Sequence, residues 1–191
     1  MSATSRVLII RELHKVDTTT PATIHVERLD GPASLLTGPL GNVFAMAAER
    51  VKATLHQYLR WTELFTEAPN AMRQMPQELD DAVNGDPDTR YYSGGFVLEA
   101  DQVLEITIPE IECDYWMIQA NTHWLEPLAG AHVNDATAER DSDGVIRVRV
   151  GTGPIAEPNA LDSGGRARGT LLYRTVDANE TVVPTVEVRE R

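Results

Sequence analysis

The chain has 191 residues, 42% hydrophobic and 24% charged, proportions typical of one soluble globular domain with a full-sized core. Its formal net charge of −12 excludes a nucleic-acid partner from our expectations, because proteins neutralise phosphates with clustered Lys and Arg. A lone cysteine, Cys113, excludes an intrachain disulfide and a paired-cysteine zinc site.

The first forty residues predict a hairpin followed by a connector. Residues 6–13 and 22–29 are rich in β-forming side chains, and a loop-like stretch at 17–21 separates them, so we expect an N-terminal β-hairpin. The apolar run at 7–10 is too short for a secretion signal or a membrane span. We therefore expect a cytoplasmic protein with no membrane partner. Residues 31–41 hold the Gly and Pro pairs typical of a connector.

Apolar side chains recur at steps of three and four over residues 43–67 and predict one long amphipathic helix. This apolar stripe contains Phe44, Ala47, Val51, Leu55, Tyr58, Thr62 and Phe65. The first interpretation is a helix that covers the core with the stripe, and the alternative is a helix that binds a partner. Pro69 ends this helix, and Pro76 begins a second, shorter one.

From residue 87 onward the chain predicts short strands separated by Gly and Pro turns, at 90–98, 103–108, 114–124, 131–139, 145–150, 170–176 and 185–189. The Asp-Ser-Asp-Gly sequence at 141–144 favours a tight turn over a calcium loop, because the other calcium ligands are missing. We expect a mainly β, antiparallel sandwich of jelly-roll type, with one long and one short α-helix. Residues 1–191 form a single domain: hairpin and connector at 1–40, helices at 41–86 and sandwich at 87–191.

Motifs in the second half resemble one known family. They are Tyr-Tyr-Ser-Gly-Gly-Phe at 91–96, Leu-Glu-Ile at 104–106, Tyr-Trp-Met-Ile-Gln at 115–119, residues 121–126 with Asn134, residues 158–170, and Val-Pro-Thr-Val at 183–186. In order and spacing they are similar to the domain of unknown function 1214 family. The resemblance implies a bacterial β-sandwich of jelly-roll type and no general activity.

The chain departs from this family at two places. Ala160 stands where family members commonly have a tryptophan. Residues 127–131 are small or apolar, whereas the family often has polar and aromatic residues there. Both changes open space, which either enlarges a cavity or abandons a site that the family uses.

Strand alternation divides residues 113–124 between two faces. One face is the predicted core and carries Trp116, Ile118, Ala120 and Trp124. The other carries Cys113, Tyr115, Met117, Gln119, Asn121 and His123, and the next strand would add His132 and Asn134. Two interpretations stay open for this second face. It forms either the wall of a pocket for an apolar small molecule or the solvent-exposed side of a sheet.

Acid–base chemistry on that face would depend on His123, with Glu126 or Tyr115 as its partner. We expect no metal, because His123 and His132 lack the His-x-His spacing of a cupin, and we expect no other cofactor. Cys113 has acidic sequence neighbours that disfavour a thiolate, so a structural thiol is the preferred interpretation.

The loop at 151–169 is long for a connection between strands, and such loops are functional or held locally. Asn159, Asp162 and Arg166 are its polar candidates. They form either a structural clamp or contacts to a substrate.

Three functions follow from these patterns. The first is a binding or accessory domain for an apolar metabolite in a bacterial pathway. The second is a cofactor-independent enzyme, such as an isomerase, cyclase or lyase. The third is a structural homo-oligomer with the long helix as its interface.

Overall fold

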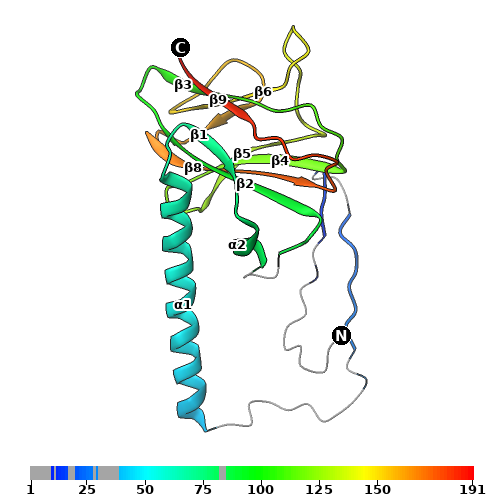
Figure 1. Cartoon of the computed structure of the whole chain (residues 1–191), viewed down its shortest axis with the longest axis vertical. Helices are drawn as coiled ribbons and strands as arrows, with labels where there is room; N and C mark the ends of the chain where they lie inside the picture. Colours follow the sequence, from blue (N-terminus) through cyan, green and yellow to red (C-terminus); the bar gives the residue numbers. More distant parts are fainter. Residues whose placement is uncertain (1–9, 11, 17–19, 28, 30–38, 82–84) are drawn as a thin grey trace.

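The computed structural model describes residues 10, 12–16, 20–27, 29, 39–81 and 85–191. Two β-sheets form the body of the molecule, and a long helix projects from it (Figure 1). The predicted class is confirmed at this level: the protein is mainly β, with two sheets, one long helix and one short helix. Among the described residues, no helix is both long and apolar enough to cross a membrane.

The first sheet has five strands, in the spatial order β1 (Ala71–Gln74), β2 (Thr89–Val97), β8 (Arg168–Val176), β4 (Tyr115–Asn121) and β5 (Pro127–Asn134). The second has four, in the order β7 (Ala160–Asp162), β6 (Arg147–Gly151), β3 (Gln102–Thr107) and β9 (Thr185–Glu190). Neighbouring strands are antiparallel except for β6 and β7, which are parallel. The seven predicted strands all overlap observed ones, whereas β1 and β7 are too short to give a periodic signal.

The strand predicted at 131–139 is observed nearer the amino terminus, as β5, because the strand ends at Asn134. Its Oδ1 atom accepts hydrogen bonds from the amides of Ala136 and Thr137, both at 3.0 Å, and so begins a turn. At its other end β5 starts at Pro127, before the predicted strand begins.

The core lies between the sheets and follows the predicted alternation. Trp116, Ile118 and Ala120 of β4 belong to it, and the Tyr173 ring lies 6.2 Å from the Trp116 ring. The core assignment of Trp124 is wrong, since this side chain is 63% exposed. β4 ends at Asn121, and a turn closed by a hydrogen bond from the Thr122 amide to the Glu126 carbonyl (2.8 Å) carries Trp124 outward.

The expected N-terminal hairpin lies partly outside the described residues. Within the two predicted strands, the described residues 10, 12, 13, 22–27 and 29 form no β-ladder. A different contact joins the two stretches: the Glu12 carboxylate accepts the Ala22 amide at 2.8 and 3.0 Å. The hairpin prediction is wrong for the residues that can be compared.

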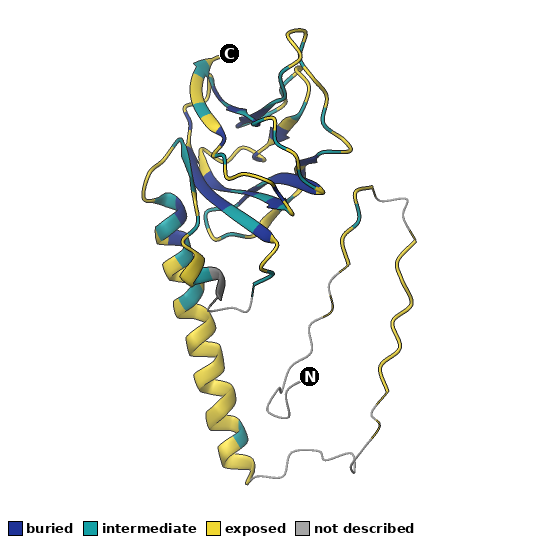
Figure 2. Ribbon diagram, turned by 45° about the vertical axis from the view of Figure 1, so that its right-hand side comes forward, coloured by how far each residue is buried: buried dark blue, intermediate teal, exposed yellow. Residues whose placement is uncertain are grey.

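The long helix, α1 (Leu40–Thr66), contacts the sheet only at its carboxyl end, where Thr62 and Phe65 are buried. The remaining turns are exposed (Figure 2). Gly95 of β2 permits the contact, because a Cβ there would lie 2.9 Å from the Phe65 carbonyl oxygen. The core-covering interpretation therefore holds for the last turns and is wrong for residues 40–58. The short helix, α2 (Gln77–Asp81), follows β1.

Candidate functional site

The candidate site lies on the outer face of the five-stranded sheet, which is the face turned away from the four-stranded sheet. Gln119 of β4 is paired with Leu172 of β8 and His132 of β5. Met117, two residues earlier, is paired with Arg174 and Asn134. Side chains two residues apart share a face, so these groups form one continuous surface, as the alternation predicted for its β4 and β5 members.

Residues 12–16 cross this surface, and we call them the strap. Lys15 fixes the strap by donating to Asp135 Oδ2 (2.7 Å) and to the Asp114 carbonyl (2.6 Å). Asn134 Nδ2 donates to the Lys15 carbonyl (2.8 Å). The strap converts an open sheet face into a covered one.

A cavity of about 410 Å³ lies between the strap and the sheet, and we call it the strap cavity. Its sheet wall includes the predicted site residues Tyr115, Met117, Gln119, His132 and Asn134. Tyr115 is 4% exposed, Met117 and Asn134 are also buried, and His132 is exposed. The solvent-face interpretation is therefore wrong for Tyr115, Met117 and Asn134, and the structure shows a lined recess.

Arg174 is the cation on the sheet wall of the strap cavity, and the sequence analysis missed it. Its guanidinium carbon lies 5.8 Å from the centre of the Tyr115 ring, within the range of a cation–π contact. Its Nε atom is buried and has no hydrogen-bond partner among the described residues. The alternation of β8 could have identified it, because Leu171 and Tyr173 point inward and Arg174 must then point outward.

A histidine and a carboxylate meet in the strap itself. His14 Nε2 lies 3.2 Å from Glu12 Oε1, and both residues line the strap cavity. His14 Nδ1 is buried without a partner in the described part of the chain. The Glu-x-His spacing puts both side chains on one side of an extended segment, but only the tertiary structure places that segment over the sheet.

A second recess of about 300 Å³, the helix cavity, lies where the carboxyl end of α1 meets the same sheet face. Gln119 lines both cavities, and Asn121 lines only this one. Gln119 Nε2 donates to Asn121 Oδ1 (2.7 Å), which orients both amides. The other lining residues are mainly apolar or aromatic: Tyr58, Trp61, Phe65, Met75, Leu79, Gly85, Tyr91, Leu125 and Leu172.

The predicted catalytic pair lies elsewhere. His123 and Glu126 flank the turn after β4, and neither lines the strap cavity or the helix cavity. The His123 ring packs against the Trp124 ring at 5.0 Å. Of the three predicted catalytic residues, Tyr115 lines the strap cavity, and the other two line neither the strap cavity nor the helix cavity.

The loop candidates hold the chain together locally. Asn159 Nδ2 donates to the carbonyls of Glu139 (2.7 Å) and Arg147 (3.0 Å), and Asp162 Oδ1 accepts the Gly164 amide (2.7 Å). Arg166 donates to the Ser163 carbonyl (3.0 Å). These bonds support the clamp interpretation. A substrate contact by these residues stays a prediction, and none of them lines either cavity.

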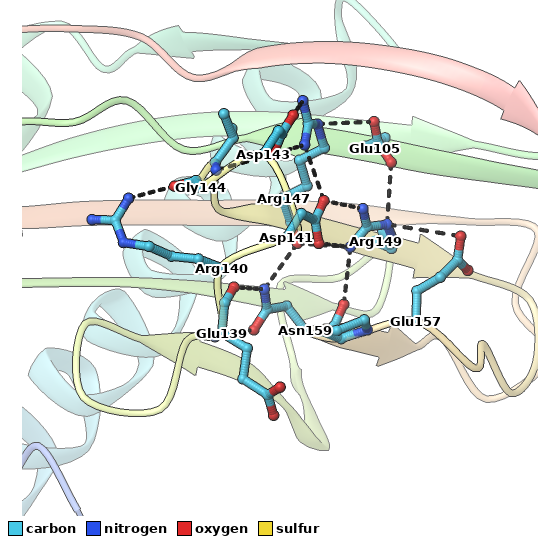
Figure 3. Close-up of polar contacts among 12 residues, drawn as sticks. Glu105, Glu139, Arg140, Asp141, Asp143, Gly144, Arg147, Arg149, Glu157 and Asn159 are labelled. Carbon is cyan, nitrogen blue, oxygen red and sulfur yellow. Dashed lines mark hydrogen bonds and ion pairs between the residues drawn. The ribbon is translucent and has the colours of Figure 1, made fainter.

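A network of ion pairs lies on the four-stranded sheet (Figure 3). Arg149 binds Glu105 and Asp141, and Arg147 binds Asp141 and Asp143. The bond from Arg149 lowers the pKa of Asp141, and the bond from Arg147 lowers the pKa of Asp143 to about 2. The network anchors the predicted turn at 141–144, which a hydrogen bond from the Gly144 amide to the Asp141 carbonyl (2.8 Å) confirms.

Two further expectations concern metal binding and the thiol. Across the described ranges, no cluster of His, Cys, Asp and Glu could hold a metal ion. Cys113 is half-buried, and this burial raises the pKa of its thiol. A raised pKa disfavours the nucleophilic thiolate, as expected for a structural cysteine.

No family model matches the chain, and neither does any curated protein. The fold is similar to the crystal structure of an uncharacterised protein from Burkholderia cenocepacia. The identity is 31% and the TM-score 0.65, over 70% of this chain and 38% of that chain. The VPA0106 protein from Vibrio parahaemolyticus is 16% identical with a TM-score of 0.44, over 59% of this chain and 34% of that chain. The chain thus spans little more than a third of these solved chains.

Proposed function

We propose that the protein binds a small, mostly apolar molecule with one anionic oxygen group in the strap cavity. The carrying observation is Arg174, a cation whose buried Nε has no partner in the described residues, set in a wall that includes Tyr115 and Met117. A mostly apolar recess with a few convergent polar groups is the usual form of a small-molecule site.

The surrounding groups give each part of such a ligand a contact. The Arg174 guanidinium, whose planar donors match a carboxylate or sulfate, would hold the anionic end. Gln119 and His132 would contact a second polar group, and Met117, Leu128 and Ala131 would contact the apolar body. Asn134 instead serves the strap and its own turn, because Lys15, Ala136 and Thr137 already engage its amide.

A thermal-shift screen of aliphatic and aromatic carboxylates, each paired with its uncharged amide, tests the proposal. The carboxylates should raise the melting temperature of the wild-type protein and the amides should not. In Arg174→Gln, we expect the affinity for a confirmed ligand, measured by calorimetry, to fall at least tenfold. One lost charge-assisted hydrogen bond accounts for a loss of that size.

Arg168→Gln is the matched control, because Arg168 lies on the same strand, is exposed and does not line the strap cavity. This variant should bind like the wild type. Equal losses of affinity in both variants would mean that only the net charge of the protein matters. No carboxylate binding at all would refute the proposal.

The contact between His14 and Glu12 favours a second candidate function, a cofactor-independent enzyme. A histidine with a carboxylate partner can move a proton near neutral pH, and here the pair lies at the wall of the strap cavity. This replaces His123 as the proposed acid or base. If turnover of a bound ligand is found, His14→Ala should abolish it and His123→Ala should not. The reverse result would restore the original assignment.

The jelly-roll topology and membership of the domain of unknown function 1214 family stay predictions. So do a cytoplasmic location and a role in a bacterial pathway. The structural likeness to the Burkholderia cenocepacia protein supports the fold and brings no reaction with it.

A further inference from the structure

The exposed part of α1 is the largest feature that ligand binding leaves unexplained. Phe44 is 66% exposed and Val51 70%, and Leu40, Leu55 and Tyr58 are also exposed. With 3.6 residues per turn, these side chains and Ala47 fall within an arc of roughly 80°. The same arc contains Thr62, which is buried against the sheet. The contact surface of α1 thus continues beyond the body of its own molecule (Figure 2).

The spacing of the exposed part of the stripe is symmetric along the helix. From Phe44 to Tyr58 the steps are three, four, four and three residues, so the pattern is the same in both directions from Val51. A surface that matches its own reversed copy is the requirement for a two-fold interface, in which the same patch meets itself. A face selected only to cover its own sheet does not require this symmetry.

We infer that α1 pairs with α1 of a second copy of this chain in an antiparallel dimer, with the two-fold axis at Val51. Val51 then faces its own counterpart. Phe44 lies beside Tyr58 of the partner subunit, and Ala47 lies beside Leu55 of the partner subunit, so a small side chain faces a larger one. Two aromatic pairs and two small–large pairs fill the seam.

The available area fits a dimer. The exposed parts of Leu40, Phe44, Val51, Leu55 and Tyr58 amount to roughly 400 Å² of apolar surface per helix. A standard interface buries about 800 Å² per partner, a little more than half of it apolar, which is roughly 450 Å². The stripe alone therefore supplies nearly the apolar share of a stable dimer interface.

The dimer also affects the helix cavity, which Tyr58, Trp61 and Phe65 of α1 help to line. The antiparallel register puts Phe44 of the partner subunit beside Tyr58, at the edge of this cavity. Helices in proteins are stabilised mostly by the packing of their amphipathic face, so the pairing would also explain why the exposed turns of α1 are helical.

Cysteine cross-linking in a Cys113→Ser background tests the axis. Val51→Cys should form a disulfide-linked dimer under mild oxidation, because the two sulfur atoms meet at the axis. Glu49→Cys, on the opposite side of the helix, is the matched control and should give at least tenfold less cross-linked dimer. Equal cross-linking of both variants would overturn the proposal.

Mixing single variants, one of them enlarged by a tag, tests the direction of pairing. Phe44→Cys with Tyr58→Cys should give the mixed dimer, and neither variant should link efficiently to itself. Self-linking of each variant would indicate a parallel pair and contradict the two-fold axis at Val51.

Light scattering of the unmodified chain should report twice the monomer mass, and Val51→Glu should weaken the dimer at least 100-fold. The melting temperature of the monomeric Val51→Glu variant should stay close to that of wild-type protein diluted until it dissociates, because Val51 does not contact the sheets. A wild-type monomer at all concentrations would mean that something other than a second copy covers α1, and it would refute the dimer.

Discussion

At the scale of single residues, Arg149 is the charged side chain on which the four-stranded sheet depends most. It is 6% exposed and donates to Glu105 and Asp141 and to the carbonyls of Arg147 and Pro158. Removing one member of a buried ion pair costs several kcal/mol, because the partner stays buried without its counter-charge. We expect Arg149→Met to lower the free energy of unfolding in urea by about 3 kcal/mol.

Arg140→Met is the matched control for this measurement. Arg140 is exposed, meets the exposed Glu110 at 3.4 Å and donates an exposed hydrogen bond to the Gly144 carbonyl (2.6 Å). An exposed pair contributes little, so the change should stay within about 0.5 kcal/mol. Equal effects of the two substitutions would contradict the structural role assigned to the network.

The same network predicts a dependence of stability on acid. The pKa of Asp143 is lowered to about 2 from 3.8, and the pKa of Asp141 is also lowered, in both cases mainly by hydrogen bonds from arginine. A lowered folded-state pKa contributes stability that is fully present above the unfolded value and is lost as the pH falls through the folded value. The melting temperature should therefore fall between about pH 4 and pH 2.

Arg147→Gln should reduce the part of this fall in melting temperature that comes from Asp143. Without Arg147, the pKa of Asp143 returns toward its unfolded value and the two states bind protons alike. Melting curves from pH 6 to pH 2 for the variant and the wild type make the comparison. Parallel curves would show that other carboxylates control the acid transition.

The face on which a side chain lies could be predicted from the sequence wherever the alternation of a strand determines it. Tyr115, Met117 and Gln119 share one face because successive strand residues alternate. Trp124 follows the same period in the sequence, but the strand ends three residues earlier. The period carries no information beyond that end, which is why both the tryptophan and His123 were misplaced.

At the scale of elements, Lys15 holds the strap over the strap cavity. The pair with Asp135 is partly exposed, so its loss should change global stability by less than about 1 kcal/mol. We expect Lys15→Ala to speed hydrogen exchange in residues 12–16 and to weaken ligand binding several-fold. Hydrogen exchange followed by mass spectrometry measures the first effect.

Lys52→Ala on α1 is the control for the strap, because it removes the same charge far along the helix from the strap. Unchanged exchange in Lys15→Ala would mean that the strap is held by other contacts.

The sequence predicted some helices and strands without predicting which other elements they pack against. The periodicity of α1 predicted a helix and its apolar side but not what covers that side, because an amphipathic pattern is the same against a sheet or a second helix. The strap gave no signal, since its hydrogen bonds join residues about one hundred positions apart. β-propensity alone predicted a hairpin there, but residues 12–16 bind the five-stranded sheet instead of forming one.

At the scale of the whole molecule, the two sheets carry different structural features. The four-stranded sheet carries the saturated ion-pair network and the clamped loop at 159–166 (Figure 3). The five-stranded sheet carries both cavities and an arginine whose buried Nε has no partner among the residues described. Under the proposed function, stability and ligand binding depend on different sheets, so substitutions on one sheet should leave the property of the other nearly unchanged.

The central claim is that the strap cavity binds a ligand through Arg174, and nuclear magnetic resonance during a ligand titration tests it most directly. A carboxylate that raises the melting temperature should shift the Arg174 Nε signal and the amide signals of residues 12–16, 115–119 and 132. The four-stranded sheet should stay unchanged. Shifts confined to α1 or to the loop at 159–166, with Arg174 unaffected, would contradict the account.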